Sequence, residues 1–297
     1  MRMRRAPNKQ LQPTVIPKTV RGARAPFHYA RAPRFMRQRA AAELRGFGAY
    51  SLKEPIVSQR HLVILDVDGT LVQSLQAEAR LFPLACETAL GIREISANWE
   101  SYRCPSDRGI VRELIEIHHG REVEEREYLR VEQHFLELIR DAYAEQPSRC
   151  QPVLGAREAV TNFTRTADLA LSVATAGWRR TALHKLEFAG VQASNLPIAT
   201  SHDAERKADI MRIAADRASE HYGVGEFASV ICFGDSYGDA RAAEELGYGF
   251  IGIDTGYVMA EEHVFPDFGS LDEILATMRT IQRAQCARRS LRGGGGA

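Results

Sequence analysis

Residues 61–70 read His-Leu-Val-Ile-Leu-Asp-Val-Asp-Gly-Thr, and this stretch decides the fold. The run His61–Leu65 is apolar and is followed by turn-forming residues, which is typical of a strand buried on both faces of a parallel sheet. Similar runs recur at Leu169–Ala174, Leu196–Ala199, Val230–Phe233 and Phe250–Ile253, and helical patterns between them cover Arg179–Phe188, Lys207–His221 and Asp239–Leu246. Strand and helix alternate through the second half. The pattern predicts an α/β fold with a doubly wound parallel sheet.

Between the first two predicted strands lie about a hundred residues with helical patterns. One apolar stripe contains Tyr128, Val131, Phe135, Leu138, Ile139 and Ala142. Ser106 precedes a second helix that should end at Gly120. We therefore expect an α/β core at residues 59–75 and 150–284, and a helical-bundle cap at residues 76–149 above the carboxyl edge of the sheet.

The two ends of the chain differ from the rest in composition. Residues 1–60 hold 14 of the 39 Lys and Arg but only two of the 38 acidic residues, so a basic segment precedes an acidic body. We expect residues 1–58 to be disordered, and we expect a flexible tail at residues 285–297. The basic segment fits an organelle presequence, a nucleic-acid-binding arm or an upstream extension of the reading frame. The first serine is Ser51, which favours the last interpretation.

The composition also bounds the class of protein. No apolar stretch reaches the roughly 18 residues of a membrane span, and no apolar core follows the first arginines as in a signal peptide. The five cysteines form no CxxC pair, so we expect them to be free thiols in a reducing compartment. These features predict a cytoplasmic location without a membrane partner. The sequence leaves the oligomeric state open.

Four short segments should meet at the carboxyl edge of the sheet, because each follows a predicted strand or opens a helix. They contain Asp66 and Asp68, Thr175 and Ala176, Lys207, and finally Asp235 and Asp239. Paired carboxylates, a hydroxyl and an ammonium suit phosphoryl transfer, in which catalysis is mainly positioning and neutralisation of charge.

Each of these groups has a chemical role in such a reaction. Asp66 can attack phosphorus and form an aspartyl-phosphate, and Asp68 can protonate the leaving oxygen and later deprotonate water. Thr175 and the amide of Ala176 can hold the phosphate, whose charge Lys207 offsets. Clustered carboxylates need a hard cation, so we expect Mg²⁺ on oxygen ligands from Asp66, Asp68, Asp235 and Asp239.

These residues match, in order and spacing, the four motifs of the haloacid dehalogenase superfamily, which the chain resembles from about His61 to Ile281. The predicted helical cap resembles that of its phosphoglycolate phosphatase-like branch. The resemblance implies Mg²⁺-dependent hydrolysis of a small phosphorylated metabolite, with a cap that closes over the site. It also implies the roles given above for the individual residues.

Two departures separate the chain from the best-matched members of that branch. Gln73 stands before Ser74 where many of these phosphatases have an acid, and Lys207 is not followed by proline. The resemblance therefore does not identify the substrate. Asp68 favours a phosphate ester over a halide, because a halide leaving group needs no proton. A phosphomutase and a nucleic-acid-binding protein acting through the basic segment remain as alternatives, although nucleic acid is the less favoured partner.

Two further residues are candidates for substrate contacts. Arg108, near the start of a predicted cap helix, has the charge to select an anionic substrate, although an arginine there is more often solvated. Trp178 follows the Thr175 segment and has the size to form a pocket wall, although packing between helix and sheet explains it equally well.

Overall fold

The computed structural model describes residues 60–255 and 261–293. The predicted disorder of residues 1–58 concerns residues outside this part. A parallel six-stranded sheet has the order β5-β4-β1-β6-β7-β8. Its strands are β1 (His61–Leu65), β4 (Leu169–Ala174), β5 (Ile198–Ala199), β6 (Ser229–Gly234), β7 (Gly249–Ile253) and β8 (Val264–Phe265). The predicted doubly wound α/β fold is confirmed, and β1 and β4 have their predicted bounds.

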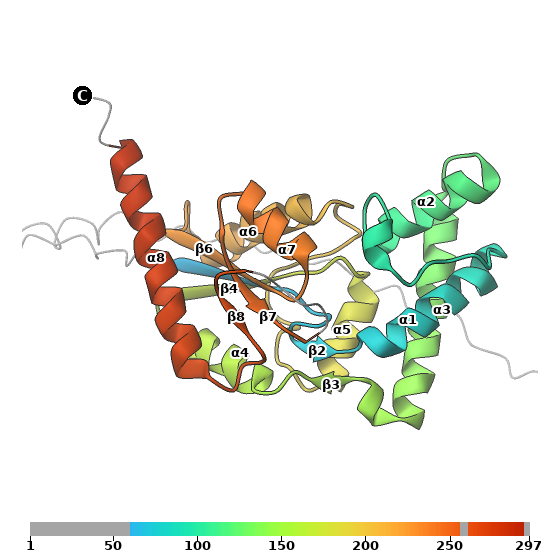
Figure 1. Ribbon diagram of the computed structural model, residues 1–297, viewed down its shortest axis with the longest axis horizontal. Coiled ribbons are helices and arrows are strands. Elements are labelled where there is room, and N and C mark those ends of the chain that lie inside the picture. Colours follow the sequence, from blue (N-terminus) through green and yellow to red (C-terminus); the bar gives the residue numbers. More distant parts are fainter. Residues whose placement is uncertain (1–59, 256–260, 294–297) are drawn as a thin grey trace, which may run out of the picture. The chain divides into compact units, whose positions relative to one another are not determined.

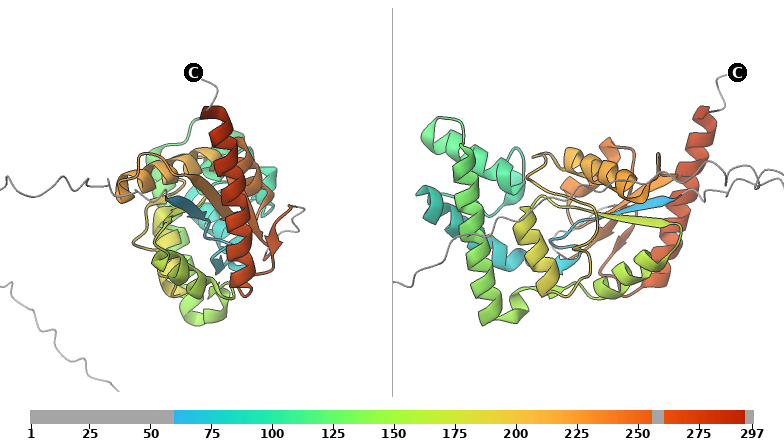
Figure 2. Two further views of the ribbon diagram at one scale, coloured as in Figure 1. Left: turned by 90° about the vertical axis from the view of Figure 1, so that its left-hand side faces the viewer. Right: turned by 180° about the vertical axis from the view of Figure 1, so that it is seen from behind.

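Successive strand residues point to opposite faces of the sheet, so each strand contributes side chains to both faces. Helices cover both of these faces. Leu62 and Ile64 of β1 belong to a buried cluster with α6 (Lys207–Tyr222) and α7 (Tyr237–Glu245). Val63 and Leu65 belong to the cluster on the other face, with α4 (Ala156–Arg165), α5 (Arg179–Phe188) and α8 (Leu271–Gly293). The turned views in Figure 2 show the sheet between these helices.

A helical insert, residues 75–149, leaves the sheet after β1. It contains α1 (Leu75–Leu90), α2 (Asp107–His119), α3 (Glu125–Glu145) and the 3₁₀ turns η2 (Trp99–Ser101) and η3 (Pro147–Arg149). The short strands β2 (Val72–Gln73) and β3 (Gln151–Pro152) pair antiparallel where the chain enters and leaves the insert. Figure 1 shows the insert beyond the carboxyl ends of the strands.

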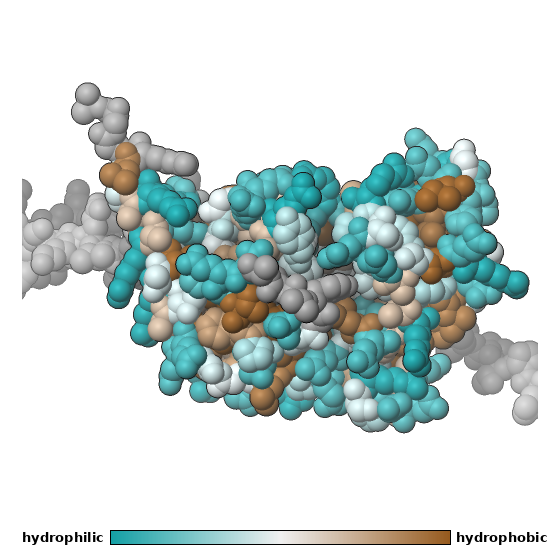
Figure 3. Space-filling model, in the orientation of Figure 1, coloured by the Kyte–Doolittle hydropathy of each residue, from teal (hydrophilic) through white to brown (hydrophobic). Residues whose placement is uncertain are grey.

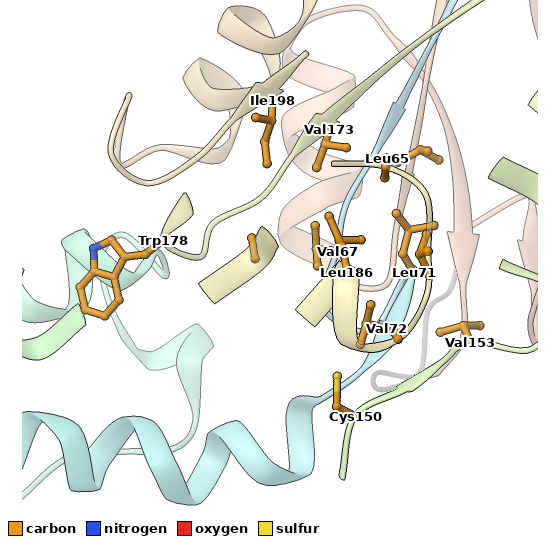
Figure 4. Close-up of a cluster of buried hydrophobic side chains, with 14 of the residues drawn as sticks. Leu65, Val67, Leu71, Val72, Cys150, Val153, Val173, Trp178, Leu186 and Ile198 are labelled. Atoms are coloured by element: carbon orange, nitrogen blue, oxygen red, sulfur yellow. The ribbon is translucent and has the colours of Figure 1, made fainter. Parts of the chain in front are cut away.

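The local signals for the insert helices correspond to observed caps and contacts. Ser106 accepts a hydrogen bond from the Gly109 amide and caps α2, and Gly120 ends α2 in the left-handed conformation. Five of the six residues in the predicted stripe of α3 are buried, and Leu138 packs against them. The buried face joins the insert to the core, because Trp178 at the start of α5 stacks on Phe82 with ring centroids 5.8 Å apart. In Figure 4 the Trp178 side chain lies toward the insert, apart from the strand residues.

The predicted flexible tail from residue 285 is wrong for residues 285–293, which continue α8. The side chain of Gln285 accepts a hydrogen bond from the Val230 amide and donates one to its carbonyl, both at 3.0 Å. The final glycines suggested a tail, but the preceding residues favour a helix and attach it to the core. Residues 294–297 lie outside the described part.

The surface carries both hydrophilic and hydrophobic side chains. Hydrophilic side chains cover most of the face shown in Figure 3, and small hydrophobic patches lie over the insert. Among the described helices, none is long and apolar enough to cross a membrane.

Candidate active site

Three buried carboxylates meet where the strands β1 and β6 end. Asp66 follows β1, Asp235 follows β6, and Asp239 lies in the first turn of α7. Each offers one carboxylate oxygen, and these oxygens all lie within 4.8 Å of one another. The structure therefore brings together the first and last predicted motifs at one edge of the sheet.

Gly69 makes this approach possible. Its φ of +75° lies in the left-handed region that favours glycine. A Cβ atom at this position would lie 1.9 Å from Oδ2 of Asp235. The loop after β1 can therefore pass beside Asp235 only because residue 69 has no side chain.

Lys207, the first residue of α6, holds the carboxylates together. Its Nζ lies 2.6 Å from Oδ1 of Asp66 and 2.7 Å from Oδ1 of Asp239. Asp239 also closes a capping box, because its Oδ2 accepts hydrogen bonds from the amide and hydroxyl of Ser236. Asp239 thus stabilises the start of α7 and contributes charge to the cluster.

Burial dominates the electrostatics of the cluster. It raises the pKa of Asp66 to about 7, against the opposing effect of Lys207. It raises the pKa of Asp235 well above its usual range, and the neighbouring carboxylates of Asp239 and Asp66 add to the effect. Oδ2 of Asp235 is buried without a hydrogen-bond partner. A buried carboxylate oxygen of this kind, beside two others, fits a hard divalent cation.

A cavity of about 160 Å³ opens beside the cluster. Its lining residues come from the sheet edge and the insert: Asp66, Asp68, Leu75, Glu78, Phe82, Trp99, Glu100, Pro105, Asp107, Ile110, Thr175, Ala176, Gly177, Lys207, Asp235, Ser236, Gly238 and Asp239. Thr175 is buried after β4, and its Oγ1 accepts a hydrogen bond from the Gly177 amide. All seven residues predicted for catalysis, phosphate and metal therefore line one pocket.

Asp68 has different partners from the other carboxylates. Nζ of Lys185 lies 2.6 Å from its Oδ1 and 2.7 Å from its Oδ2, and the hydroxyl of Ser74 donates to Oδ1 at 2.6 Å. Burial alone would raise the pKa of Asp68, but Lys185 and these hydrogen bonds lower it below its usual range. The role of Asp68 as a metal ligand stays a prediction. Its carboxylate contacts Lys185 and Ser74, and the described carboxylates that lie together are those of Asp66, Asp235 and Asp239.

Sequence reasoning missed Lys185, Glu78 and Asp107. Lys185 is buried in α5 and also contacts Oε1 of Glu78 at 2.7 Å. Burial raises the pKa of Glu78 to about 7 and that of Asp107 to about 8, while Lys185 opposes both shifts. One signal was present, because Lys185 lies on the same helical stripe as Ala182 and Leu186, where an apolar residue would be expected.

The structure places the two weaker candidates for substrate contacts, Arg108 and Trp178, outside the pocket lining. The guanidinium of Arg108 pairs with both carboxylate oxygens of Glu125 and lies 3.7 Å from the ring centre of Tyr128. Arg108 therefore links α2 to α3 and does not line the pocket. Trp178 is fully buried between α5 and the insert and does not line the pocket either. The neighbour of Arg108, Asp107, takes the pocket position, and its Oδ2 accepts a hydrogen bond from the Trp178 amide.

Comparison with known proteins identifies the family. The sequence profile of the haloacid dehalogenase-like hydrolases matches residues 61–247, which is more than half of the chain. The chain belongs to this family. A search of curated protein sequences finds no match.

Solved structures share the fold at low sequence identity. A hydrolase from Pseudomonas syringae is 19% identical with a TM-score of 0.55, and the alignment covers 73% of this chain and 99% of that one. CbbY from Rhodobacter sphaeroides, solved in complex with phosphate, is 17% identical with a TM-score of 0.52, covering 71% and 95%. These likenesses support the fold of core and insert together, since the matched structures are covered almost completely.

Proposed function

We propose that this hydrolase is a Mg²⁺-dependent phosphatase that cleaves a small phosphate monoester through an aspartyl-phosphate on Asp66. One observation carries the proposal: Asp66, Asp68, Thr175, Lys207 and a buried carboxylate cluster line the same pocket. The helical insert supplies the rest of the wall, and we infer that it acts as the cap of the active site.

The first half of the reaction transfers the phosphoryl group to the enzyme. Lys207 holds Oδ1 of Asp66, and no hydrogen bond from the described residues takes Oδ2. A carboxylate oxygen of Asp66 forms a bond to phosphorus while the bond from phosphorus to the leaving oxygen breaks. A proton from Asp68 goes to that oxygen, so the product leaves as an alcohol.

The second half returns Asp66 to its starting state. Asp68, now ionised, takes a proton from water, whose oxygen attacks phosphorus. The bond between phosphorus and Asp66 breaks and inorganic phosphate is released. Thr175 and the amides after it are suited to hold nonbridging oxygens through both halves, and Lys207 offsets their charge.

The residues suited to hold Mg²⁺ are Asp66 and Asp235, with Asp239 beside them. The cation would supply charge neutralisation for the phosphate and for the carboxylates. The unpartnered oxygen of Asp235 supports this assignment, since an ionised carboxylate buried without a partner is costly.

The pocket favours a leaving group without negative charge. Among the described lining residues, those from the insert include Glu78, Glu100 and Asp107 but no lysine, arginine or histidine. Phe82 and Trp99 provide apolar surface. Glycolate, or a sugar carrying a second phosphate, would find no basic partner among these lining residues of the insert. The lining therefore favours a phosphatase for neutral or amine-bearing esters over a phosphomutase.

A comparison of esters tests this proposal. Purified protein with Mg²⁺ should release phosphate from p-nitrophenyl phosphate, and Asp66→Asn should abolish the release. Among natural esters, kcat/KM for ethanolamine phosphate or glycerol phosphate should exceed that for phosphoglycolate. Undiminished turnover by Asp66→Asn would refute the nucleophile, and a preference for phosphoglycolate would refute the leaving-group assignment. Isomerised sugar phosphate without free phosphate would instead identify a mutase.

A further inference from the structure

Lys185 places a buried ammonium against the carboxylate proposed as general acid and base. The residue is 1% exposed, and its Nζ contacts both oxygens of Asp68. Ser74 adds a third hydrogen bond to the same carboxylate. A carboxylate held at both oxygens cannot rotate freely, so its direction is fixed relative to the pocket.

Lys185 is in turn held by the helical insert. Its Nζ contacts Oε1 of Glu78, which lies in the first turn of α1 and lines the pocket. Lys185 belongs to α5 of the core. The chain of contacts therefore runs from the insert through Lys185 to Asp68.

The position of Lys185 restricts what its charge can do. It is not among the described pocket-lining residues, and the carboxylates that it contacts are those of Asp68 and Glu78. Burying an ammonium costs several kcal/mol unless it is paired, and here two carboxylates pair it. Its direct contacts with the pocket lining therefore run through these two residues.

We propose that Lys185, held by Glu78, is a positioning residue that aims the Asp68 carboxyl group at the leaving oxygen. The proposal rests on the phosphatase function proposed above. It predicts that Lys185 matters most where the leaving group needs a proton. An alkoxide needs one, whereas p-nitrophenolate leaves readily without one.

The test compares kcat/KM for p-nitrophenyl phosphate with kcat/KM for glycerol phosphate. This parameter reports the first, phosphoryl-transfer half of the reaction when that half is irreversible. Lys185→Met should lower the value for glycerol phosphate by about 10²-fold and that for the aryl ester by less than about fivefold. Asp68→Asn should shift the ratio in the same direction and further.

Three variants keep the comparison decisive. Lys185→Arg keeps the charge and should give an intermediate ratio. Glu78→Gln removes the charge that holds Lys185 and should shift the ratio in the same direction, but less. Leu186→Met, at the next buried position of α5, should leave the ratio as in the wild type even if stability falls. If Lys185→Met does not fold, Lys185→Arg and Glu78→Gln provide the ratio.

Equal loss of kcat/KM for both esters in these variants would overturn the inference, because it would show a purely structural role. An unchanged kcat/KM for both would overturn it as well. Wild-type protein that hydrolyses neither ester would refute the proposed function, and with it the inference. Failure of the proposed function is distinguishable from failure of the inference about Lys185, because the wild-type protein alone reveals it.

Discussion

Gly69 is under two constraints, its positive φ and its close approach to Asp235. Gly69→Ala places a side chain at φ +75° and drives its Cβ into Oδ2 of Asp235. Both effects destabilise the fold, and the second also displaces the carboxylate cluster. We predict a loss of about 2–4 kcal/mol in the free energy of unfolding, measured by urea denaturation, together with loss of phosphatase activity.

Gly91 provides the matched control. It ends α1 with φ +74°, and a Cβ there would meet no atom within 4 Å. Gly91→Ala should therefore show only the backbone cost of about 1 kcal/mol and keep its activity. Equal losses in the two variants would contradict the close approach of Gly69 to Asp235.

Asp235 should show opposite effects with and without a cation. Its Oδ2 is buried and unpartnered, and burial raises its pKa well above the usual range. Asp235→Asn replaces this buried ionisable group with a neutral amide, so the metal-free protein should unfold at the same or a higher temperature. The Mg²⁺-dependent rise in Tm should disappear, together with the activity.

The control for that prediction is Asp216→Asn on α6. The Asp216 side chain is 66% exposed and pairs with Arg212 at the surface. This variant should keep both the rise in Tm with Mg²⁺ and the activity. A full Mg²⁺ response in Asp235→Asn would show that the cation binds elsewhere.

At the scale of the elements, most of the core could be predicted because its signals are local. The apolar runs at β1 and β4 and the pattern of α5 gave the correct bounds, and the cap of α2 was recognised from Ser106 and Gly120. The seven residues predicted for catalysis, phosphate and metal line one pocket for the same reason, since each lies just after a strand or in the first turn of a helix. Contacts between distant segments gave no such signal, which is why Lys185 and the pairing of β2 with β3 were missed.

The end of α8 shows how a long-range contact decides a boundary. Gln285 extends the hydrogen-bonding edge of β6 by binding both backbone groups of Val230. Gln285→Ala leaves these groups without their partner, so we predict a loss of about 1–3 kcal/mol in the free energy of unfolding. Thermal and urea denaturation measure it.

The exposed neighbour Arg283 is the control, since Arg283→Ala should change the free energy of unfolding by less than about 0.5 kcal/mol. The same small change in Gln285→Ala would favour the prediction that residues 285–297 form a flexible tail.

At the scale of the whole molecule, buried acids should set the pH dependence of stability. The pKa values of Asp66 and Glu78 are raised to about 7 and that of Asp107 to about 8. Folded protein therefore retains protons that the unfolded chain loses near its ordinary pKa of about 4. Without divalent cations, the free energy of unfolding should fall as pH rises from about 5 to about 8.

Mg²⁺ should reverse this trend in part. Protons and the cation compete for Asp66 and Asp235, so the cation should raise Tm more at about pH 8 than at about pH 5. Asp68 does not oppose the trend in this window, because its lowered pKa acts only in more acidic solution. A metal-free stability that stays constant or rises from about pH 5 to about pH 8 would contradict the raised pKa values.

The fate of the phosphoryl group tests the central claim most directly. Protein turning over a phosphate ester with Mg²⁺ is quenched in acid, digested and mapped by mass spectrometry. We predict one added phosphoryl group on the peptide that contains Asp66, located on that residue, and none in Asp66→Asn. Active protein that carries the phosphoryl group on another residue, or never carries one, would contradict it.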